Sequence, residues 1–430
     1  MRTYVTHTDS YRDLRRELRS LLAAKKDSEA KDNGDVKLLL QNIAQSMSSC
    51  SVLLEEPEIT KSALPVLAAS MNDIFRDNKG RFLSLTLGLS SHIVGFDILQ
   101  KYPSLVRDIS AEALNQHRTD EGYEGLSAIF YFSHHSIGQH ILVSTDLHTK
   151  ISSAGLNRTI GAESSHSFSP LAWLVNTKVG ITILSKIPDI VDKIREDTFN
   201  QPIVSNGIKY PPPAARLVQS EEGVRFLSHY NGLLHKINEA TLNDVYDDTK
   251  NSMLFQLSCT TSGRQLLRQG LADKISIDGH DGKDGGGPSP LAYLVDAYIN
   301  KSEDYLFDLF MDDNFINKIG DQSLHNCSQN LIDDTSITIP HALLYTERGL
   351  SLLSHNGKIL EKISPDIFKN LYSEHILKFK DLLLKIKQGS VAKSKIISNL
   401  CEQFLSEPSL GSQSIFSDKK GASSNELENS

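Results

Sequence analysis

The stretch SPLAWLVNTKVGITILSKIPDIVDKI, residues 169–194, decides which fold to expect for this chain. Its apolar residues recur at helical intervals over SPLAWLV and again over ITILSKIPDIV. Ser169 can cap free N–H groups at a helix start, and Pro170 suits the first turn because it has no N–H to satisfy. Gly180 can take a positive φ at a tight turn. The stretch therefore predicts two helices joined by a turn and closed by Ile194.

This arrangement recurs along the chain. A glycine followed three and four residues later by a bulky apolar pair occurs at Gly95, Gly138, Gly180, Gly223, Gly263 and Gly349. The spacings are 43, 42, 43, 40 and 86 residues, and the last is twice 43. Residues 289–319 fill the missing unit without the glycine and with a longer turn, and Cys50 takes the glycine position in a degenerate first unit. The closing isoleucines are Ile109, Ile151, Ile194, Ile237, Ile275, Ile319 and Ile363.

Stacking explains how such units fold. One helix pair cannot bury its apolar faces alone, whereas stacked neighbours complete a continuous core. The sequence therefore predicts an all-α fold, an α-solenoid of about eight helix–turn–helix repeats of roughly 43 residues. We expect residues 1–37 to form an N-terminal helical cap, 38–363 the solenoid and 364–405 capping helices. The Ser-rich residues 406–430 are expected to be disordered.

Composition and charge exclude several classes of protein. With 39% hydrophobic and 23% charged residues and a mean hydropathy of −0.27, the chain is typical of a soluble folded protein. A net charge of −8 gives no overall positive field to hold nucleic acid. Four cysteines without a close pair suit a reducing compartment. We expect no cleavable signal peptide, and no membrane insertion because His92 and Asp97 interrupt the apolar segment 82–99.

Two features resemble ligand sites only in composition. The Gly-rich loop 278–287 lacks the Ser or Thr that follows the lysine of a phosphate-binding loop, and it lacks the oxygen ligands of an EF-hand. One predicted unit holds four histidines, His134, His135, His140 and His148. They lack the paired spacing of zinc ligands, and their positions in the repeat, at the turn and around the second helix, explain their presence without a metal. The sequence predicts no metal, cofactor or catalytic residue. An active site assembled across units or their long connectors is the alternative.

One column of residues favours binding. Seven positions before the glycines from Gly95 to Gly263 stand Gly88, Tyr131, Trp173, Arg216 and Gln256, and Tyr293 takes the matching place in SPLAYLV. The next position is apolar in each case. On a helix Trp173 lies about 200° from Leu171 and about 100° from Leu174, so it points away from the apolar stripe. A variable column of residue types enriched in interface hot spots predicts a partner-binding face. The alternative is that these side chains pack between units.

Two resemblances extend these expectations. The segments SPLAWLV and GPSPLAYLV resemble the TPLH-type opening of ankyrin repeats, although the period of about 43 residues is closer to HEAT or armadillo units. The resemblance implies a solenoid that binds proteins along its concave face. A self-associating structural scaffold is a further class to test.

The whole chain also resembles type IV-secreted effectors of intracellular bacteria. The features that carry this resemblance are divergent helical repeats, no enzyme signature and the tail SLGSQSIFSDKKGASSNELENS, with Glu426 and Glu428 as its acidic residues. The resemblance implies a C-terminal secretion signal within 406–430, the host cytosol as working compartment and a host protein as partner. An ordinary polar tail on a protein of the bacterial cytoplasm is the alternative.

Overall fold

The computed structural model describes residues 46–76, 82–118, 125–160, 168–205, 207–246, 251–275, 289–320, 327–332 and 335–363, together with scattered residues at 13–44, 324, 380–384 and 402. The prediction of a mostly helical chain is confirmed. The loop 278–287 and the tail 406–430 lie outside the described residues, as do most of 1–37 and 364–405. Contacts divide the chain into two compact parts, 1–294 and 295–430, and the division falls within helix α23 (Pro290–Asn300).

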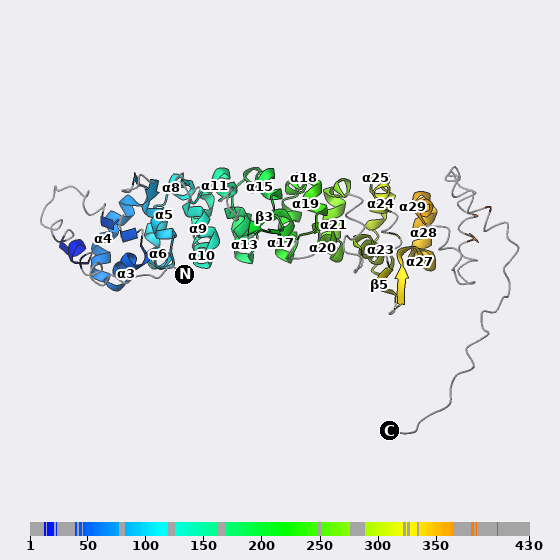
Figure 1. The fold of residues 1–430 in the computed structure, drawn as a ribbon, viewed down its shortest axis with the longest axis horizontal. Helices are drawn as coiled ribbons and strands as arrows, with labels where there is room; N and C mark the ends of the chain where they lie inside the picture. Colours follow the sequence, from blue (N-terminus) through cyan, green and yellow to red (C-terminus); the bar gives the residue numbers. More distant parts are fainter. Residues whose placement is uncertain are drawn as a thin grey trace, which may run out of the picture. The chain divides into compact units, whose positions relative to one another are not determined.

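Helices of the first part occur in a recurring order (Figure 1). The first helices of the predicted units are α5 (Leu85–Ser90), α9 (Ala128–His134), α12 (Pro170–Leu174), α16 (Pro213–Leu217), α20 (Met253–Cys259) and the start of α23. The second helices are α3 (Met47–Glu55), α6 (Ile93–Lys101), α10 (Ser136–Ser144), α13 (Lys178–Lys186), α17 (Glu221–His229) and α21 (Thr261–Gly270). Each second helix packs against the next one along the chain.

The predicted second helices are each divided in two, and the connectors after the closing isoleucines contain short helices where the sequence predicts loops. After the second helices come α4 (Pro57–Ser70), α7 (Pro103–Arg107), η1 (Asp146–Lys150), α14 (Ile190–Lys193), α18 (Gly232–Lys236) and η2 (Ala272–Lys274). Four further helices follow, namely α8 (Ala111–Asn115), α11 (Ser153–Asn157), α15 (Glu196–Asn200) and α19 (Glu239–Asn243). The prediction of two helices and a loop is therefore incomplete, because these connectors bury their own apolar residues and form helical turns around them.

Antiparallel hairpins stand between some units. In the first part β1 (Ile74–Arg76) pairs with β2 (Phe82–Ser84), and β3 (Ile203–Ser205) pairs with β4 (Ile208–Tyr210), Val204 facing Lys209 in register. Gly207 has a φ of 78° at the second of these turns, a left-handed conformation that favours glycine.

The second part has the same kinds of element. It contains α24 (Leu306–Met311), α25 (Asp313–Asn317), β5 (Cys327–Ile332), β6 (Thr335–Thr338), α27 (Ile339–Tyr345), α28 (Glu347–His355) and α29 (Gly357–Lys362). The longer turn predicted after its first helix holds Ser302, whose φ is 55°. The Asn356 amide donates to the carbonyl of Phe310 at 2.8 Å, which connects α28 and α29 to α24.

The repeated glycines act differently from the prediction. None of the six has a positive φ; each is the third residue of a second helix. A Cβ atom at Gly180 would lie 2.1 Å from the carbonyl oxygen of Leu174, and at Gly95 it would lie 1.8 Å from that of Leu89. Glycine is therefore required because the two helices approach too closely for any side chain. A residue three positions earlier caps most of these helices, as Thr177 does by accepting from the Gly180 N–H at 2.9 Å.

The predicted core positions are buried. The apolar pairs after the glycines have exposed fractions of 5% or less, and so do all seven closing isoleucines. The predicted helix start is confirmed too, because α12 begins at Pro170 and the Ser169 hydroxyl accepts from the Ala172 N–H at 3.1 Å. At the N-terminus, Arg15 and Arg19 both pair with Glu56, which precedes α4.

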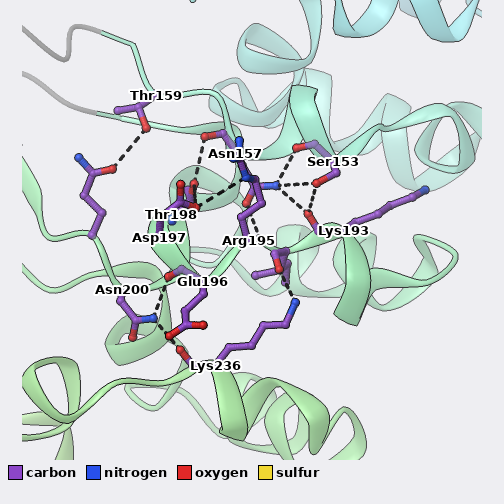
Figure 2. Close-up of polar contacts among 12 residues, drawn as sticks. Ser153, Asn157, Thr159, Lys193, Arg195, Glu196, Asp197, Thr198, Asn200 and Lys236 are labelled. Atoms are coloured by element: carbon purple, nitrogen blue, oxygen red, sulfur yellow. Dashed lines mark hydrogen bonds and ion pairs between the residues drawn. The ribbon is translucent and has the colours of Figure 1, made fainter.

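A series of asparagines joins each predicted unit to the next. Its members lie 42 or 43 residues apart and are Asn72, Asn115, Asn157, Asn200 and Asn243. Asn157 Nδ2 donates to the Lys193 carbonyl at 2.7 Å, and its Oδ1 accepts from the Arg195 N–H at 2.9 Å (Figure 2). The two peptide groups lie on either side of Ile194, so a single amide bonds to the backbone both before and after that residue. Asn72, Asn115 and Asn200 make the same pair of bonds, and Asn243 makes the first.

Lysines bond back toward the preceding unit. A lysine stands immediately before every closing isoleucine from Ile151 onward. Lys236 Nζ donates to the carbonyls of Val191 and Ile194 at 2.5 and 2.6 Å. Within the first part Lys150 and Lys274 make corresponding bonds, and within the second part so does Lys362. A cation at these carbonyls satisfies acceptors that a helix end leaves open.

Candidate interaction surface

The predicted column lies on the first helices, and its five side chains are all half-buried. The adjacent apolar positions are fully buried, as predicted: Leu89, Phe132, Leu174, Leu217, Leu257 and Leu294. The helical register therefore places one position in the core and the preceding one at its edge. The column side chains are thus in part accessible to solvent and in part held by neighbouring residues.

Trp173 is the most constrained member. Its ring stacks on Phe168, with centroids 5.1 Å apart, and meets the edge of His134 from the preceding unit at 4.3 Å. The indole Nε1 is covered and has no hydrogen-bond partner among the residues that the structure describes. A covered N–H without an acceptor is unfavourable by about 1–3 kcal/mol. The tryptophan therefore has a donor that the described part of the chain does not satisfy.

The aromatic contacts continue through α9. Tyr131 meets Phe130 edge to face at 5.6 Å, and Phe130 stacks on His134 at 6.1 Å. His134 then reaches Trp173, so the first two members of the column belong to one aromatic cluster that crosses a unit boundary. The contact between His134 and Trp173 joins two predicted units. The alternative to partner binding, that the column side chains pack between units, therefore holds in part for these rings.

Arg216 extends the surface into the following unit. Its Nη1 donates to the side-chain oxygen of Asn176 at 2.9 Å, and its Nε donates to the Pro211 carbonyl at 3.2 Å. The guanidinium carbon lies 5.8 Å from the centre of the Tyr210 ring. These contacts fix the guanidinium beside the unit that carries Trp173 and orient it before any partner binds.

Gln256 and Tyr293 complete the column. Gln256 Oε1 is covered, and no described residue donates a hydrogen bond to it. Tyr293 meets Phe255 edge to face at 5.6 Å, a contact between α20 and the start of α23. The column therefore has two unsatisfied polar atoms, an acceptor here and the Trp173 donor.

The histidines lie where the repeat predicts them. His134 ends α9 and His135 is the N-cap of α10, whereas His140 lies within α10 and His148 within η1. Burial lowers the pKa of His134, and the neighbouring His135 lowers that pKa further. Burial also lowers the pKa of His135. In the described part of the chain, no cluster of three or more His, Cys, Asp or Glu side chains could hold a metal ion.

A small cavity lies beside the surface. It is partly open to solvent and is lined by uncharged residues of α11 to α16 and their connectors: Thr159, Ser169, Ala172, Thr198, Gln201, Pro202, Ile203 and Pro213. Small-molecule sites usually enclose most of their ligand and contain polar groups that converge on it. Since none of these lining side chains can exchange a proton near neutral pH, the cavity offers no general acid or base.

Sequence reasoning missed the residues that hold the surface in place. The asparagine series and the lysines before the closing isoleucines both recur at the repeat spacing, so a signal was present in the sequence.

None of the described helices combines the length and the hydropathy needed to cross a lipid bilayer. No protein-family model matches the sequence, and comparisons with curated proteins and with solved structures found no match.

Proposed function

We propose that this chain is a protein-binding α-solenoid, ankyrin-like or HEAT-like, that engages its partner along a concave face through the column. The observation that carries the proposal is the half-buried aromatic cluster that joins Tyr131 to Trp173 across a unit boundary. Partly exposed Trp and Tyr supply large contact areas with little loss of side-chain entropy, and they dominate interface hot spots.

The inter-unit bonds support the solenoid part of the proposal. The asparagine amides join residues 31 to 38 positions apart in sequence, and the lysines reach back over 37 to 45. Contacts of this range join each unit to its neighbours rather than to distant units, which is the pattern of a solenoid. Such an array presents its first helices as a row, so that side chains at equivalent positions can contact one extended partner.

Affinity capture from eukaryotic cytosol tests the binding proposal. The column variant carries Tyr131→Ala, Trp173→Ala, Arg216→Ala and Tyr293→Ala. A matched control carries alanine at exposed positions of the second helices in neighbouring units, namely His140, Thr182, Arg225 and Gln265. Circular dichroism first checks that all three chains have the same helicity. A stoichiometric partner that the wild type and the control retain and the column variant loses supports the proposal.

Two results would contradict it. If all three chains retain the same partner, the column is not the binding site. If none of them captures a protein and the wild type self-associates, a structural scaffold becomes the better description.

We further propose that the protein is a translocated bacterial effector that works in the host cytosol on a host protein. This proposal depends on the sequence of residues 406–430. A reporter enzyme fused to the full chain should enter host cells from bacteria with an intact type IV secretion system, and should not enter from bacteria without one. Glu426→Gln with Glu428→Gln should reduce entry. Equal entry from both strains would contradict the proposal.

A further inference from the structure

We propose that His92 makes the packing of the first predicted unit acid-sensitive, so that protonation of its ring releases helix α3 from helix α6. The inference goes beyond the binding function, because it concerns when the N-terminal end of the chain is closed and not what the column binds. It follows from the two hydrogen bonds of the His92 ring and from the elements packed around it.

His92 is the N-cap of α6, and both of its ring nitrogens contact backbone groups. Nδ1 accepts from the Gly95 N–H at 3.0 Å, and Nε2 lies 3.1 Å from the carbonyl oxygen of Ala44, 48 positions earlier. An N–H group can only donate and a carbonyl can only accept, so the ring carries its single proton on Nε2. The neutral imidazole therefore caps one predicted unit and bonds to the unit before it.

A protonated ring cannot make this pair of bonds. The imidazolium ion carries a proton on each nitrogen, so Nδ1 no longer accepts and directs its proton at the Gly95 N–H. Other histidines of the chain differ, because their Nδ1 atoms face carbonyls: His140 faces Ser136 at 2.8 Å and His148 faces Thr145 at 2.7 Å. A nitrogen that donates keeps its bond when the ring becomes charged, so acid breaks the cap at His92 and spares those two bonds.

The site around the ring is closely packed. Helix α6 packs against α3 and α5 (Figure 1). Ala44 is buried, and a Cβ atom at Gly88 of α5 would lie 3.0 Å from the same Ala44 oxygen. Burial lowers the pKa of His92, and the hydrogen bond to Ala44 raises that pKa in part. The neutral ring therefore contributes fully to stability above pH 6.5, and this contribution is lost as the pH falls through the lower pKa of the folded chain.

The surrounding elements supply no counter-ion bonded to the charged ring, since backbone groups occupy both nitrogens. Residues 38–54 contain no charged side chain, and neither does α5. On α6 itself, Asp97 stands five positions after His92, about 140° around the helix. The other titratable or charged groups on α6 and on the elements packed against it are Cys50 and Glu55 on α3, Lys101 on α6, Arg107 on α7, His140 on α10 and His135 at the N-cap of α10.

The repeat supplies the variant that separates the cap from its titration. The same position, three residues before a glycine, holds Thr177, Thr260 and Thr346, whose hydroxyls accept from the glycine N–H at 2.9 to 3.1 Å. His92→Thr should therefore keep the cap of α6 at every pH. Asparagine also caps helices without titrating, so His92→Asn serves the same purpose where the threonine chain folds poorly.

Labelling of Cys50 tests the inference. This thiol on α3 is buried, which raises its pKa to about 12, and it donates to the Ile43 carbonyl at 3.3 Å, so a reagent reaches it only when α3 leaves its neighbours. The full wild-type chain, His92→Thr and a control with His135→Gln and His140→Gln are treated with a pyridyl disulfide at pH 7.5 and at pH 5. Mass spectrometry of the Cys50 peptide gives each rate, and the ratio of wild type to His92→Thr at one pH cancels the pH dependence of the reagent.

We expect this ratio to rise about fivefold between pH 7.5 and pH 5, which is the change in an opening equilibrium when a helix loses its N-cap. The control should respond to acid like the wild type. A ratio that does not change with pH would overturn the inference. So would a rise that the control abolishes, because His135 or His140 would then be its source. Nitrogen NMR of the histidine-labelled chain adds an independent check, since a His92 ring with its proton on Nδ1 at pH 7.5 also overturns the inference.

Discussion

The asparagine series and the column recur with the same period and differ in what they contact. Each asparagine of the series bonds to backbone groups that flank a closing isoleucine, and the same residue type occurs in five successive units. The column holds Tyr, Trp, Arg, Gln and Tyr, and those side chains contact mainly other side chains. Equivalent backbone groups lie within reach of each asparagine, so the same side chain satisfies them in every case. The column side chains do not have to match a repeated backbone group, so the residue type at these positions can vary.

This difference predicts a ranking of mutational effects on stability. Positions that contact neighbouring backbone should matter most, and column positions should matter least to stability and most to binding. The five changes below test that ranking from the largest expected effect to the smallest.

Gly180→Ala should destabilise the chain most, by about 3 kcal/mol or more, because the new Cβ would collide with the Leu174 carbonyl. Urea unfolding followed by circular dichroism measures the loss. The matched control is Gly270→Ala at the end of α21, where the nearest atom lies 3.8 Å away. Alanine there should be neutral or stabilise by up to about 1 kcal/mol. Equal stability of the two variants would contradict the close approach of the helices.

Asn200→Ala should destabilise by about 2–3 kcal/mol, because the Lys236 carbonyl and the Asn238 N–H both lose their partner. The exposed Asn231, whose side chain caps no helix, is the control, and its replacement by alanine should change the free energy of unfolding by less than about 0.5 kcal/mol. If both variants unfold at the same urea concentration, the series does not hold neighbouring units together.

Lys236→Met should destabilise by about 1 kcal/mol. Methionine keeps the apolar stem but leaves the carbonyls of Val191 and Ile194 without their donor. Lys61→Met on the exposed side of α4 serves as the comparison and should unfold like the wild type. If the Lys236→Met chain is as stable as the Lys61→Met chain, water must replace the ammonium group at these carbonyls without any decrease in the free energy of unfolding.

Acidification should weaken the aromatic cluster. The pKa of His134 and that of His135 lie below the ordinary value of 6.5, so the unfolded chain binds more protons than the folded chain near that pH. The neutral rings contribute their full share to the free energy of unfolding above pH 6.5. That contribution is lost as the pH falls through the pKa values of the two histidines in the folded chain, which lie below 6.5. Melting temperatures of the wild type and of His134→Gln with His135→Gln, compared from pH 7.5 to 5, should fall less steeply in the variant. Parallel curves would exclude this pair as a source of the pH dependence.

Gln256→Leu should have the smallest effect on stability. The glutamine oxygen is covered without a donor, so its removal should be neutral or should stabilise by up to about 1 kcal/mol. The same change should weaken partner capture if the column is the binding face. Asn200→Leu provides the contrast within one experiment, because that amide bonds to backbone on both sides. Destabilisation of both variants by similar amounts would remove the distinction between the series and the column.

Local sequence determined much of this protein. The spacing of the glycines identified the repeat and the second helices, Ser169 and Pro170 marked a helix start, and the closing isoleucines identified buried positions. Each of these signals depends on the burial or the backbone preference of a few consecutive residues. The spacing of apolar residues along the sequence indicates that burial without knowledge of the tertiary structure. The position of the column at the edge of the core followed from the same helical geometry.

The tertiary structure decided why those residues are needed and what joins the units. Gly180 is required by the Leu174 carbonyl of the helix before it and not by its own φ angle. Asn157 and Lys236 are needed because backbone groups about 40 positions away come within hydrogen-bond reach. Distances between separate backbone segments depend on how the helices pack, and a pattern of apolar residues fixes which face is buried but not which polar atoms meet across it.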